Sequence, residues 1–284
     1  EDVDVAPRIA CIQMVSSTDV LVNINTAREL IAQAVADGAQ VVVLPEYFCI
    51  MGRNETDKLA VAEDFVGEAT HEGMPLQYFL RQQAILHQIY LIAGTIPLRS
   101  NDPNKVFNTT LIYAPTGRIE ARYDKIHLFG FTNGVESYSE GDAIMAGDAT
   151  SPCVWNSPWG RIGVAICYDI RFPELFRMAG DVVAWVVVAA FTHTTGQAHW
   201  EVLLRARAIE NGAFQAMVTN SGTINGGIFK DAVTNHGTII GGRFFSSVTN
   251  ELDGIIENGQ FGDWASSYTV TNNGGTINGG TFKE

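Results

Sequence analysis

Three side chains of this sequence could together carry out acyl transfer: the carboxylate of Glu46, the ammonium of Lys125 and the thiol of Cys167. Each follows a segment whose residues predict a strand, and these segments are residues 41–45, 118–124 and 161–166. Ligands of α/β sheets bind beyond the carboxyl ends of the strands. We therefore expect the three side chains to share one site.

In such a site the carboxylate would remove the thiol proton and so generate the nucleophile. The ammonium would stabilise the oxyanion that develops on the substrate, helped by the backbone N–H of Tyr168. Each residue also has a purely structural interpretation. A cysteine after an apolar strand is commonly a small buried hydrophobe, and a Glu or Lys at a strand end is commonly solvated. The joint occurrence of the three types favours chemistry.

The segments around these residues alternate between strand and helix patterns. Apolar residues recur at helical spacing from Val20 to Val35, and Gly38 follows as a stop signal. The predicted strands are residues 8–14, 40–44, 90–98, 106–113, 118–123, 161–166 and 182–190, and the other predicted helices are residues 76–88, 173–178 and 198–211. This alternation predicts an α/β layered fold in which helices cover a sheet.

The overall charge narrows the classes of partner. The 284 residues carry a net charge of −13, and phosphate backbones need a basic face, so nucleic-acid binding is not expected. An acidic surface also disfavours anionic membranes. The longest apolar run, residues 182–191, is half the length of a membrane span and is typical of a buried strand.

The cysteines and histidines form no metal-binding pattern. The four cysteines (Cys11, Cys49, Cys153 and Cys167) are scattered, which indicates free thiols in a reducing compartment, and we expect a cytoplasmic protein. No CxxC pair, HExxH motif or phosphate-binding glycine loop occurs. The sequence therefore predicts neither a metal site nor an organic cofactor.

A change of composition divides the chain. All nine prolines lie at or before Pro173, whereas 13 of the 28 glycines lie in the last 67 residues. These last residues repeat a Val-Thr-Asn, Thr-Ile, Gly-Gly, Phe pattern that begins at Val218, Val233, Val248 and Val270. Short strands with paired glycines at a nearly fixed period are typical of a β-solenoid. We expect an α/β domain over residues 1–217 and a Gly/Asn-rich β-repeat tail over residues 218–284; an irregular Gly/Asn-rich linker is the alternative for the tail.

Several longer motifs resemble one family. The segments LPEYF (44–48), YDKIHLF (123–129) and CYDIRFPEL (167–175) are similar to those of the nitrilase, or carbon–nitrogen hydrolase, superfamily. The segments 191–201 and 203–211 resemble its amidase branch, which includes omega-amidases and deaminated glutathione amidases. The resemblance covers about residues 8–216.

The resemblance implies a fold, a reaction and a set of residues. The implied fold is a four-layer αββα sandwich that pairs into a homodimer or a larger homo-oligomer. Glu46 would be the general base, Lys125 the oxyanion-stabilising cation, Cys167 the nucleophile and Glu136 a second glutamate that positions base and substrate. The implied reaction cleaves the C–N bond of a small carboxamide, such as an omega-amide of a short 2-oxo acid, through a thioester, and releases ammonia without a cofactor.

Four further residues are candidates for substrate binding. Arg171 closely follows the nucleophile and could bind a substrate carboxylate with two parallel hydrogen bonds; a structural ion pair with Asp169 or Glu174 is equally consistent with the sequence. Tyr47, Phe191 and Thr192 could line the pocket, and Phe191 could equally belong to the core.

The tail departs from the resemblance, because the strands that would follow residue 217 in the family are replaced by the repeats. Two hypotheses therefore stay open. The first is a working thiol amidase; nitrile or N-carbamoyl hydrolysis is a weaker form of it. The second is a catalytically inactive, truncated hydrolase body that carries a β-solenoid structural or interaction module. Retention of the catalytic candidates favours the first, and the absence of the family's C-terminal strands favours the second.

Overall fold

The computed structural model divides the chain into two compact units, Glu1–Phe214 and Gln215–Glu284. The structure describes residues 7–67, 73–132, 137–150 and 152–212, and in the second unit residues 218–220, 223–225, 228–229, 233–235, 238–240, 243–244, 248–250, 255–257, 260–261, 270–279 and 281–282. The boundary predicted between residues 217 and 218 adjoins a segment outside the described residues. Each unit is described by itself.

The larger sheet of the first unit has six strands in the order β1-β2-β3-β5-β4, with β6 beside β5. These strands are β1 (Ile9–Cys11), β2 (Val41–Val43), β3 (Tyr90–Ile92), β4 (Ile96–Arg99), β5 (Val106–Tyr113) and β6 (Ile119–Asp124). β1, β2 and β3 are parallel, and β5 is antiparallel to β3, β4 and β6. β2 and β6 therefore point the same way, and their carboxyl ends reach the same edge of the sheet.

The second sheet has three strands in the order β11-β10-β9: β9 (Cys153–Ser157), β10 (Gly160–Ile166) and β11 (Ala184–Val188). β10 is parallel to β11 and antiparallel to β9. A separate hairpin pairs β7 (Gly130–Thr132) with β8 (Ser137–Ser139). Three short 3-10 turns complete the unit: η1 (Glu55–Val61), η2 (Glu140–Asp142) and η3 (Cys167–Arg171).

Four helices cover the sheets: α1 (Val20–Ala36), α2 (Pro75–His87), α3 (Pro173–Met178) and α4 (His193–Glu210). The side chain of Asp19 caps α1 by accepting hydrogen bonds from the N–H groups of Leu21 and Val22. α2 and α3 both begin with proline, whose fixed φ and missing N–H suit the first helical turn. Gly38 follows α1 at a φ of +86°, as its predicted stop requires.

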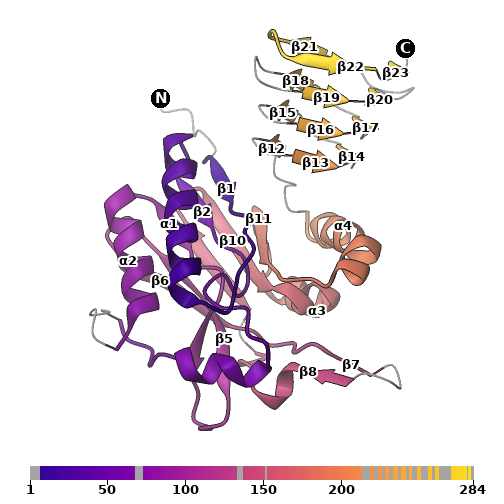
Figure 1. Cartoon of the computed structure of the whole chain (residues 1–284). Coiled ribbons are helices and arrows are strands. Elements are labelled where there is room, and N and C mark those ends of the chain that lie inside the picture. Colours follow the sequence, from indigo (N-terminus) through magenta and orange to yellow (C-terminus); the bar gives the residue numbers. More distant parts are fainter. Residues whose placement is uncertain are drawn as a thin grey trace. The chain divides into compact units, whose positions relative to one another are not determined.

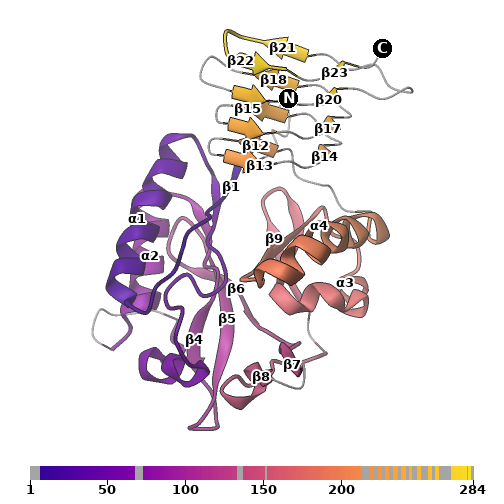
Figure 2. The ribbon, with the colours of Figure 1, turned by 45° about the vertical axis from the view of Figure 1, so that its right-hand side comes forward.

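The layers run helix, sheet, sheet, helix (Figures 1 and 2): α1 and α2 lie on the outer face of the larger sheet, and α3 and α4 lie on the outer face of the smaller one. Alternate residues of β2 enter different cores. Val42 packs in the core under α1 and α2, whereas Val41 and Val43 pack in the core that continues through the smaller sheet. Both faces of β2 are buried, which explains its unbroken run of valines. The predicted α/β layered fold is confirmed.

Three predicted elements differ in detail. Residues 90–98 form two strands, because the chain turns at Gly94, where φ is +50° and a Cβ atom would lie 2.1 Å from the carbonyl oxygen of Pro45. α4 begins at His193, five residues before its predicted start. β11 is largely half-buried, not buried as its apolar sequence predicts, because it is an edge strand among the described strands.

The second unit consists of short strands that pair in parallel. They form three four-stranded sheets, of β12, β15, β18 and β21, of β13, β16, β19 and β22, and of β14, β17, β20 and β23. These strands are β12 (Val218–Asn220), β13 (Thr223–Asn225), β14 (Ile228–Phe229), β15 (Val233–Asn235), β16 (Thr238–Ile240), β17 (Arg243–Phe244), β18 (Val248–Asn250), β19 (Ile255–Glu257), β20 (Gln260–Phe261), β21 (Val270–Asn272), β22 (Thr276–Asn278) and β23 (Thr281–Phe282). The three sheets are separate and none is closed, and the β-solenoid stays a prediction.

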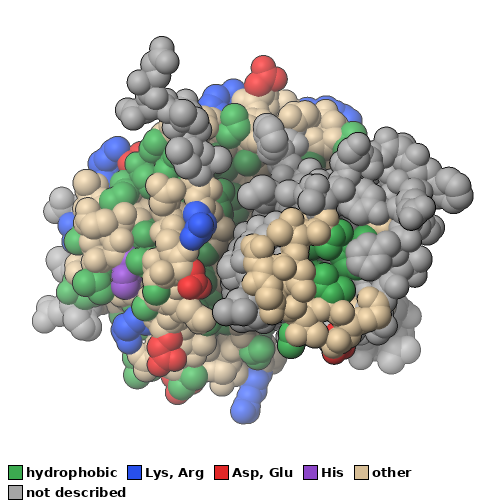
Figure 3. All heavy atoms as spheres, turned by 90° about the horizontal axis from the view of Figure 1, so that it is seen from above, with side chains coloured by type: hydrophobic (Ala, Val, Ile, Leu, Met, Phe, Trp, Pro, Cys, Tyr) green, Lys and Arg blue, Asp and Glu red, His purple; other side chains and the backbone are tan. Residues whose placement is uncertain are grey.

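The surface mixes side-chain types. On the face shown in Figure 3, acidic, basic and hydrophobic side chains are interspersed among polar ones. Within the described part of the chain, no helix combines the length and the apolar character that crossing a membrane would require.

Candidate active site

Glu46 lies two residues beyond Leu44, past the carboxyl end of β2, and is 2% exposed. Its Oε1 accepts hydrogen bonds from Lys125 Nζ and from Asn108 Nδ2, each at 3.0 Å. Its Oε2 accepts a hydrogen bond from the backbone N–H of Ala190 at 2.8 Å. The carboxylate is thus held from the larger sheet and from the chain that follows β11. Asn108 is a residue of this site that sequence reasoning missed, because nothing in its local sequence distinguishes it.

Lys125 follows β6 and is completely buried. Burial by itself lowers the pKa of its ammonium, but the neighbouring Glu46, Cys167 and Glu140 raise it, and the net shift is upward. Nζ lies 3.0 Å from Oε1 of Glu46 and 2.9 Å from Oε2 of Glu140. Lys125 is therefore a charged, oriented hydrogen-bond donor between two carboxylates.

Cys167 begins the turn η3 directly after β10, and its φ is +49°. A non-glycine residue in this region costs about 1–3 kcal/mol, and such strain concentrates at functional sites. Burial raises the pKa of the Cys167 thiol well above its ordinary value; Glu46 raises it further, whereas Lys125 and the N–H of Ala190 lower it. Burial thus favours the neutral thiol, and a base that accepts its proton would generate the nucleophile.

Glu140, in η2 after the β7–β8 hairpin, supplies a second buried carboxylate. It accepts hydrogen bonds from Lys125 Nζ, from the hydroxyl of Tyr47 at 2.8 Å and from the backbone N–H of Phe129 at 2.6 Å. The sequence-based choice for the second glutamate, Glu136, lies outside the described residues. Glu140 is four residues further along the chain, and sequence reasoning missed it.

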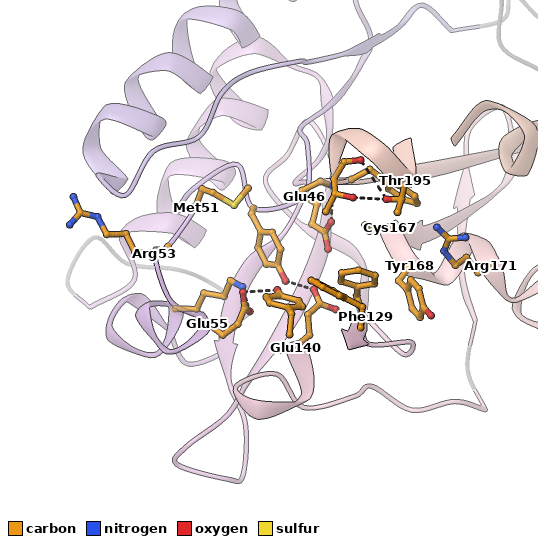
Figure 4. A pocket seen from close by; sticks show the side chains of 18 residues that line it. Glu46, Met51, Arg53, Glu55, Phe129, Glu140, Cys167, Tyr168, Arg171 and Thr195 are labelled. Carbon is orange, nitrogen blue, oxygen red and sulfur yellow. Dashed lines mark hydrogen bonds and ion pairs between the residues drawn. The ribbon is translucent and has the colours of Figure 1, made fainter. Parts of the chain in front are cut away.

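These side chains meet at a cavity of about 330 Å³. It is lined by Glu46, Tyr47, Met51, Gly52, Arg53, Glu55, Lys58, Phe129, Phe131, Tyr138, Glu140, Cys167, Tyr168, Arg171, Ala190, Phe191, Thr192 and Thr195. Figure 4 shows Glu46 and Cys167 close together, with Glu140 on one side and Arg171 on the other. All the predicted site residues within the described part of the chain line this cavity, except Lys125, which binds two of its lining residues.

Comparison with known proteins gives a consistent result. The model of the family "carbon-nitrogen hydrolase" matches residues 8–271, which is most of the chain. The chain belongs to the carbon–nitrogen hydrolase family. The match reaches beyond residue 216, where the resemblance was expected to end.

Relatives of this hydrolase include several amidases. It is 39% identical over 218 residues to the deaminated glutathione amidase of Synechocystis, covering 75% of this chain and 77% of the relative. It is 37% identical over 213 residues to omega-amidase NIT2 of Xenopus tropicalis, covering 74% of this chain and 72% of the relative.

Solved structures of the nitrilase superfamily share the fold. The NitFhit protein of C. elegans superposes with a TM-score of 0.64 at 35% identity, covering 72% of this chain and 49% of that chain. Nit3 of Saccharomyces cerevisiae, a member of branch 10 of the nitrilase superfamily, superposes with a TM-score of 0.62 at 28% identity, covering 72% of each chain. The first unit of this hydrolase thus has a nitrilase-like α/β fold.

The predicted substrate-binding residues of this hydrolase have distinct surroundings. Arg171 lies over the rings of Tyr168 and Phe191, and its terminal nitrogen lies 3.2 Å from Nδ1 of His199. Among the described residues Arg171 has no carboxylate partner, so the ion pairs considered with Asp169 and Glu174 do not form. Its Nε is buried without a hydrogen-bond partner.

Phe191 and Thr192 lie where the chain enters α4. The ring of Phe191 packs against Trp200 at a centroid distance of 4.9 Å, and the hydroxyl of Thr192 lies 2.6 Å from that of Thr195. Phe191 therefore combines both roles considered for it, since it packs against the core and also lines the cavity.

Sequence analysis did not predict three further residues that line the cavity, Glu55, Lys58 and Tyr138. Lys58 forms an ion pair with Glu55 and places its ammonium 4.0 Å from the centre of the Tyr47 ring. The hydroxyl of Tyr138 donates a hydrogen bond to Oε1 of Glu55 at 2.6 Å. Within the described ranges, no group of three or more His, Cys, Asp and Glu side chains is arranged to hold a metal ion.

Proposed function

We propose that this chain is an amidase that hydrolyses the C–N bond of small carboxamides, with Cys167 as nucleophile. The observation that carries the proposal is the set of buried ion pairs that joins Glu46, Lys125 and Glu140, beside a cysteine with positive φ on the wall of the cavity. Relatives that are named omega-amidase and deaminated glutathione amidase support the same reaction class.

Glu46 would act as general base and then as general acid. It accepts the thiol proton while Sγ of Cys167 attacks the amide carbon, and it passes this proton to the nitrogen as the C–N bond breaks. Ammonia leaves, and the acyl group stays on Cys167 as a thioester. Glu46 then takes a proton from water, the hydroxide attacks the thioester carbon, and the acid leaves as the proton returns to the thiol.

Lys125 and the backbone N–H of Tyr168 would stabilise the oxyanion in both halves of the reaction. A buried ammonium that is already oriented by two carboxylates needs no reorganisation when charge develops on the substrate oxygen. Glu140 is the better candidate than Glu136 for the second glutamate, because its carboxylate contacts Lys125 and Tyr47.

The substrate would carry a carboxylate that pairs with Arg171. The guanidinium lines the cavity, has no carboxylate partner in the described part of the chain, and keeps a buried Nε without a hydrogen bond. A planar guanidinium binds a carboxylate with two parallel hydrogen bonds. Omega-amides of short 2-oxo acids and deaminated glutathione-like amides have this group, and Tyr47, Phe191 and Thr192 would line the rest of the binding site.

We also propose the remaining properties implied by the sequence. The four cysteines are free thiols, which supports a reducing, cytoplasmic location.

In the tail, equivalent residues pair in parallel register, as Val218, Val233 and Val248 do, which supports a β-solenoid-like stack. Assembly as a homodimer or larger homo-oligomer follows from the family resemblance. The comparisons do not support the alternative of an inactive hydrolase body, since the relatives reported above are named as amidases.

The test is release of ammonia from a panel of ω-amides with and without a carboxylate. Cys167→Ala should lower the rate at least about 10³-fold. The matched control is Cys153→Ala, which removes a thiol that does not line the cavity. Activity that survives Cys167→Ala, or that falls equally in both variants, would rule out the thiol mechanism, and a folded protein without activity on any amide would rule out the amidase.

A further inference from the structure

Asp169 is a completely buried carboxylate that lies two residues after Cys167 and does not line the cavity. It accepts four hydrogen bonds. Oδ1 accepts from the backbone N–H of His127 at 3.0 Å and lies 2.8 Å from the imidazole Nδ1 of the same residue. Oδ2 accepts from the hydroxyl of Tyr123 at 2.8 Å and from the backbone N–H of Ile166 at 3.0 Å. With four donors satisfied, this carboxylate has no free position for a substrate proton.

The donors come from the two segments that carry the catalytic side chains. Tyr123 and His127 stand two residues before and two residues after Lys125, and Ile166 directly precedes Cys167. One carboxylate therefore holds the lysine segment on both sides of Lys125 and the nucleophile segment at its entry into the strained turn.

Alternate residues of the lysine segment bind two different buried carboxylates. Tyr123 and His127 bind Asp169, whereas Lys125 and Phe129 bind Glu140. Glu140 contacts the lysine ammonium itself, but Asp169 contacts neither Nζ of Lys125 nor Sγ of Cys167. The two carboxylates thus differ in what they can do: Asp169 acts through backbone N–H groups and through the side chains of Tyr123 and His127.

The nucleophile segment depends on the same residue. Cys167 has a φ of +49°, and the N–H of Phe172 donates a hydrogen bond to the backbone carbonyl of Asp169 at 3.0 Å. Asp169 therefore anchors η3 through its side chain at one end and through its backbone at the other. The ring of His127 also stacks on Phe172 at a centroid distance of 3.6 Å, which joins the two segments a second time.

We propose that Asp169 is a positioning residue that sets the separation between Lys125 and Cys167 and keeps the thiol within reach of Glu46. The proposal rests on the catalytic roles given to these residues under the proposed function. A shift of about 1 Å between reacting groups lowers rates by about 10²-fold. Loss of the Asp169 contacts should therefore reduce kcat and leave the binding of substrate by the cavity wall largely intact.

The first variant is Asp169→Asn, which keeps the size of the side chain but replaces one acceptor oxygen by an NH₂ group that cannot accept. We expect kcat to fall about 10²-fold with KM changed less than about threefold. We also expect alkylation of Cys167 by iodoacetamide, measured by peptide mass spectrometry, to slow at least about tenfold, because the thiol loses its alignment with Glu46.

The second variant is Tyr123→Phe, which deletes one hydrogen bond and decides the matter if Asp169→Asn does not fold. It should lower both kcat and the Cys167 alkylation rate by a smaller factor, about threefold to tenfold. The matched control is Asp124→Asn. Asp124 lies beside Lys125 in the same segment but bonds to Thr109 and Arg122, so both rates should stay within twofold of the parent protein.

Alkylation needs no substrate, so it tests Asp169 even if no amide is cleaved. Folded Asp169→Asn or Tyr123→Phe protein with an unchanged Cys167 alkylation rate would overturn the proposal, whatever happens to kcat. A rise in KM that accounts for the whole loss of activity would also overturn it, because it would indicate a role in shaping the cavity. Failure of the amidase proposal would show separately, as a parent protein whose Cys167 is alkylated but which releases no ammonia.

Discussion

The two sheets of the first unit are covered to different extents. All three residues of β2 in the larger sheet are buried, whereas four of the five residues of β11 in the smaller sheet are half-buried. The covering helices differ in the same way. α2 buries six side chains, whereas among the described side chains of α4 only Arg207 is buried. Glu46 and Lys125 come from the well-covered sheet, and Cys167 comes from the other.

This difference indicates two ways of fixing a catalytic group. A close-packed core on both faces holds the segments that carry the base and the ammonium. The nucleophile segment follows β10, whose last five residues are also buried, and individual hydrogen bonds to polar groups hold it in addition: Asp169 binds Ile166, and Arg207 donates from α4 to the carbonyl of Ile170 at 2.8 Å. Apolar deletions should therefore cost more stability under α2 than under α4, whereas polar substitutions around the site should act on kcat in both halves.

The largest effect is expected from a cavity in the well-covered half. Leu80→Ala, at a completely buried position of α2, should lower the free energy of unfolding by about 2–5 kcal/mol. The same substitution at the half-buried Leu204 of α4 should cost about 1 kcal/mol, since less apolar area leaves water there. Urea unfolding of both variants measures the two losses of unfolding free energy. Equal losses would show that the two halves do not differ in packing.

The second-largest predicted effect is a fall in kcat when the Glu140 carboxylate, which binds Lys125, is replaced. Glu140→Gln leaves one acceptor oxygen for three donors, so the ammonium should lose its orientation and kcat should fall about 10²-fold, or about 2.7 kcal/mol in activation free energy. Steady-state kinetics measures this change. The control is Glu120→Gln. Glu120 lies on β6, the strand that precedes Lys125, but it pairs with Arg118, so this variant should leave kcat unchanged. A Glu140→Gln enzyme with the parent kcat would exclude a role for this carboxylate.

The smallest predicted effect is a loss of stability at high pH that should be the same for a buried cysteine in either core. Burial raises the pKa of Cys49, in the first core, and of Cys153, in the second, from an ordinary value of about 9 to about 12. The unfolded thiols lose their protons at lower pH than the folded ones. Each thiol therefore leaves stability intact below about pH 9 and lowers it by up to about 1.4 kcal/mol per pH unit between about pH 9 and 12.

Urea unfolding between pH 8 and 10.5 checks this expectation. Cys49→Ala and Cys153→Ala should each flatten the decline of unfolding free energy with pH by a similar amount, because both thiols are shielded in the same way. A slope that neither variant changes would contradict the burial of these thiols. If only one variant changes this slope, the two cores differ in how well they shield a thiol from water.

The local pattern was enough to predict most elements and three catalytic candidates. Strand-end positions of Glu46, Lys125 and Cys167 follow from short apolar runs, and the hairpin of β5 and β6 follows from its Pro-Thr-Gly turn. The carboxyl ends of β2 and β10 then bring Glu46 and Cys167 to one cavity, and the carboxyl end of β6 brings Lys125 against two of the residues that line it. These features depend on preferences of neighbouring residues, which can be derived from the sequence alone.

The tertiary structure alone decided which other polar groups complete the site. The resemblance pointed to Glu136, which lies outside the described residues, and sequence analysis did not consider Glu140; the path of the chain after β8 places Glu140 against Lys125. Asn108 and Asp169 look ordinary in the sequence, and they acquire their roles because a neighbouring strand or turn brings donors and acceptors to them. Such contacts join residues up to 93 positions apart, so their partners depend on how layers pack and not on local periodicity.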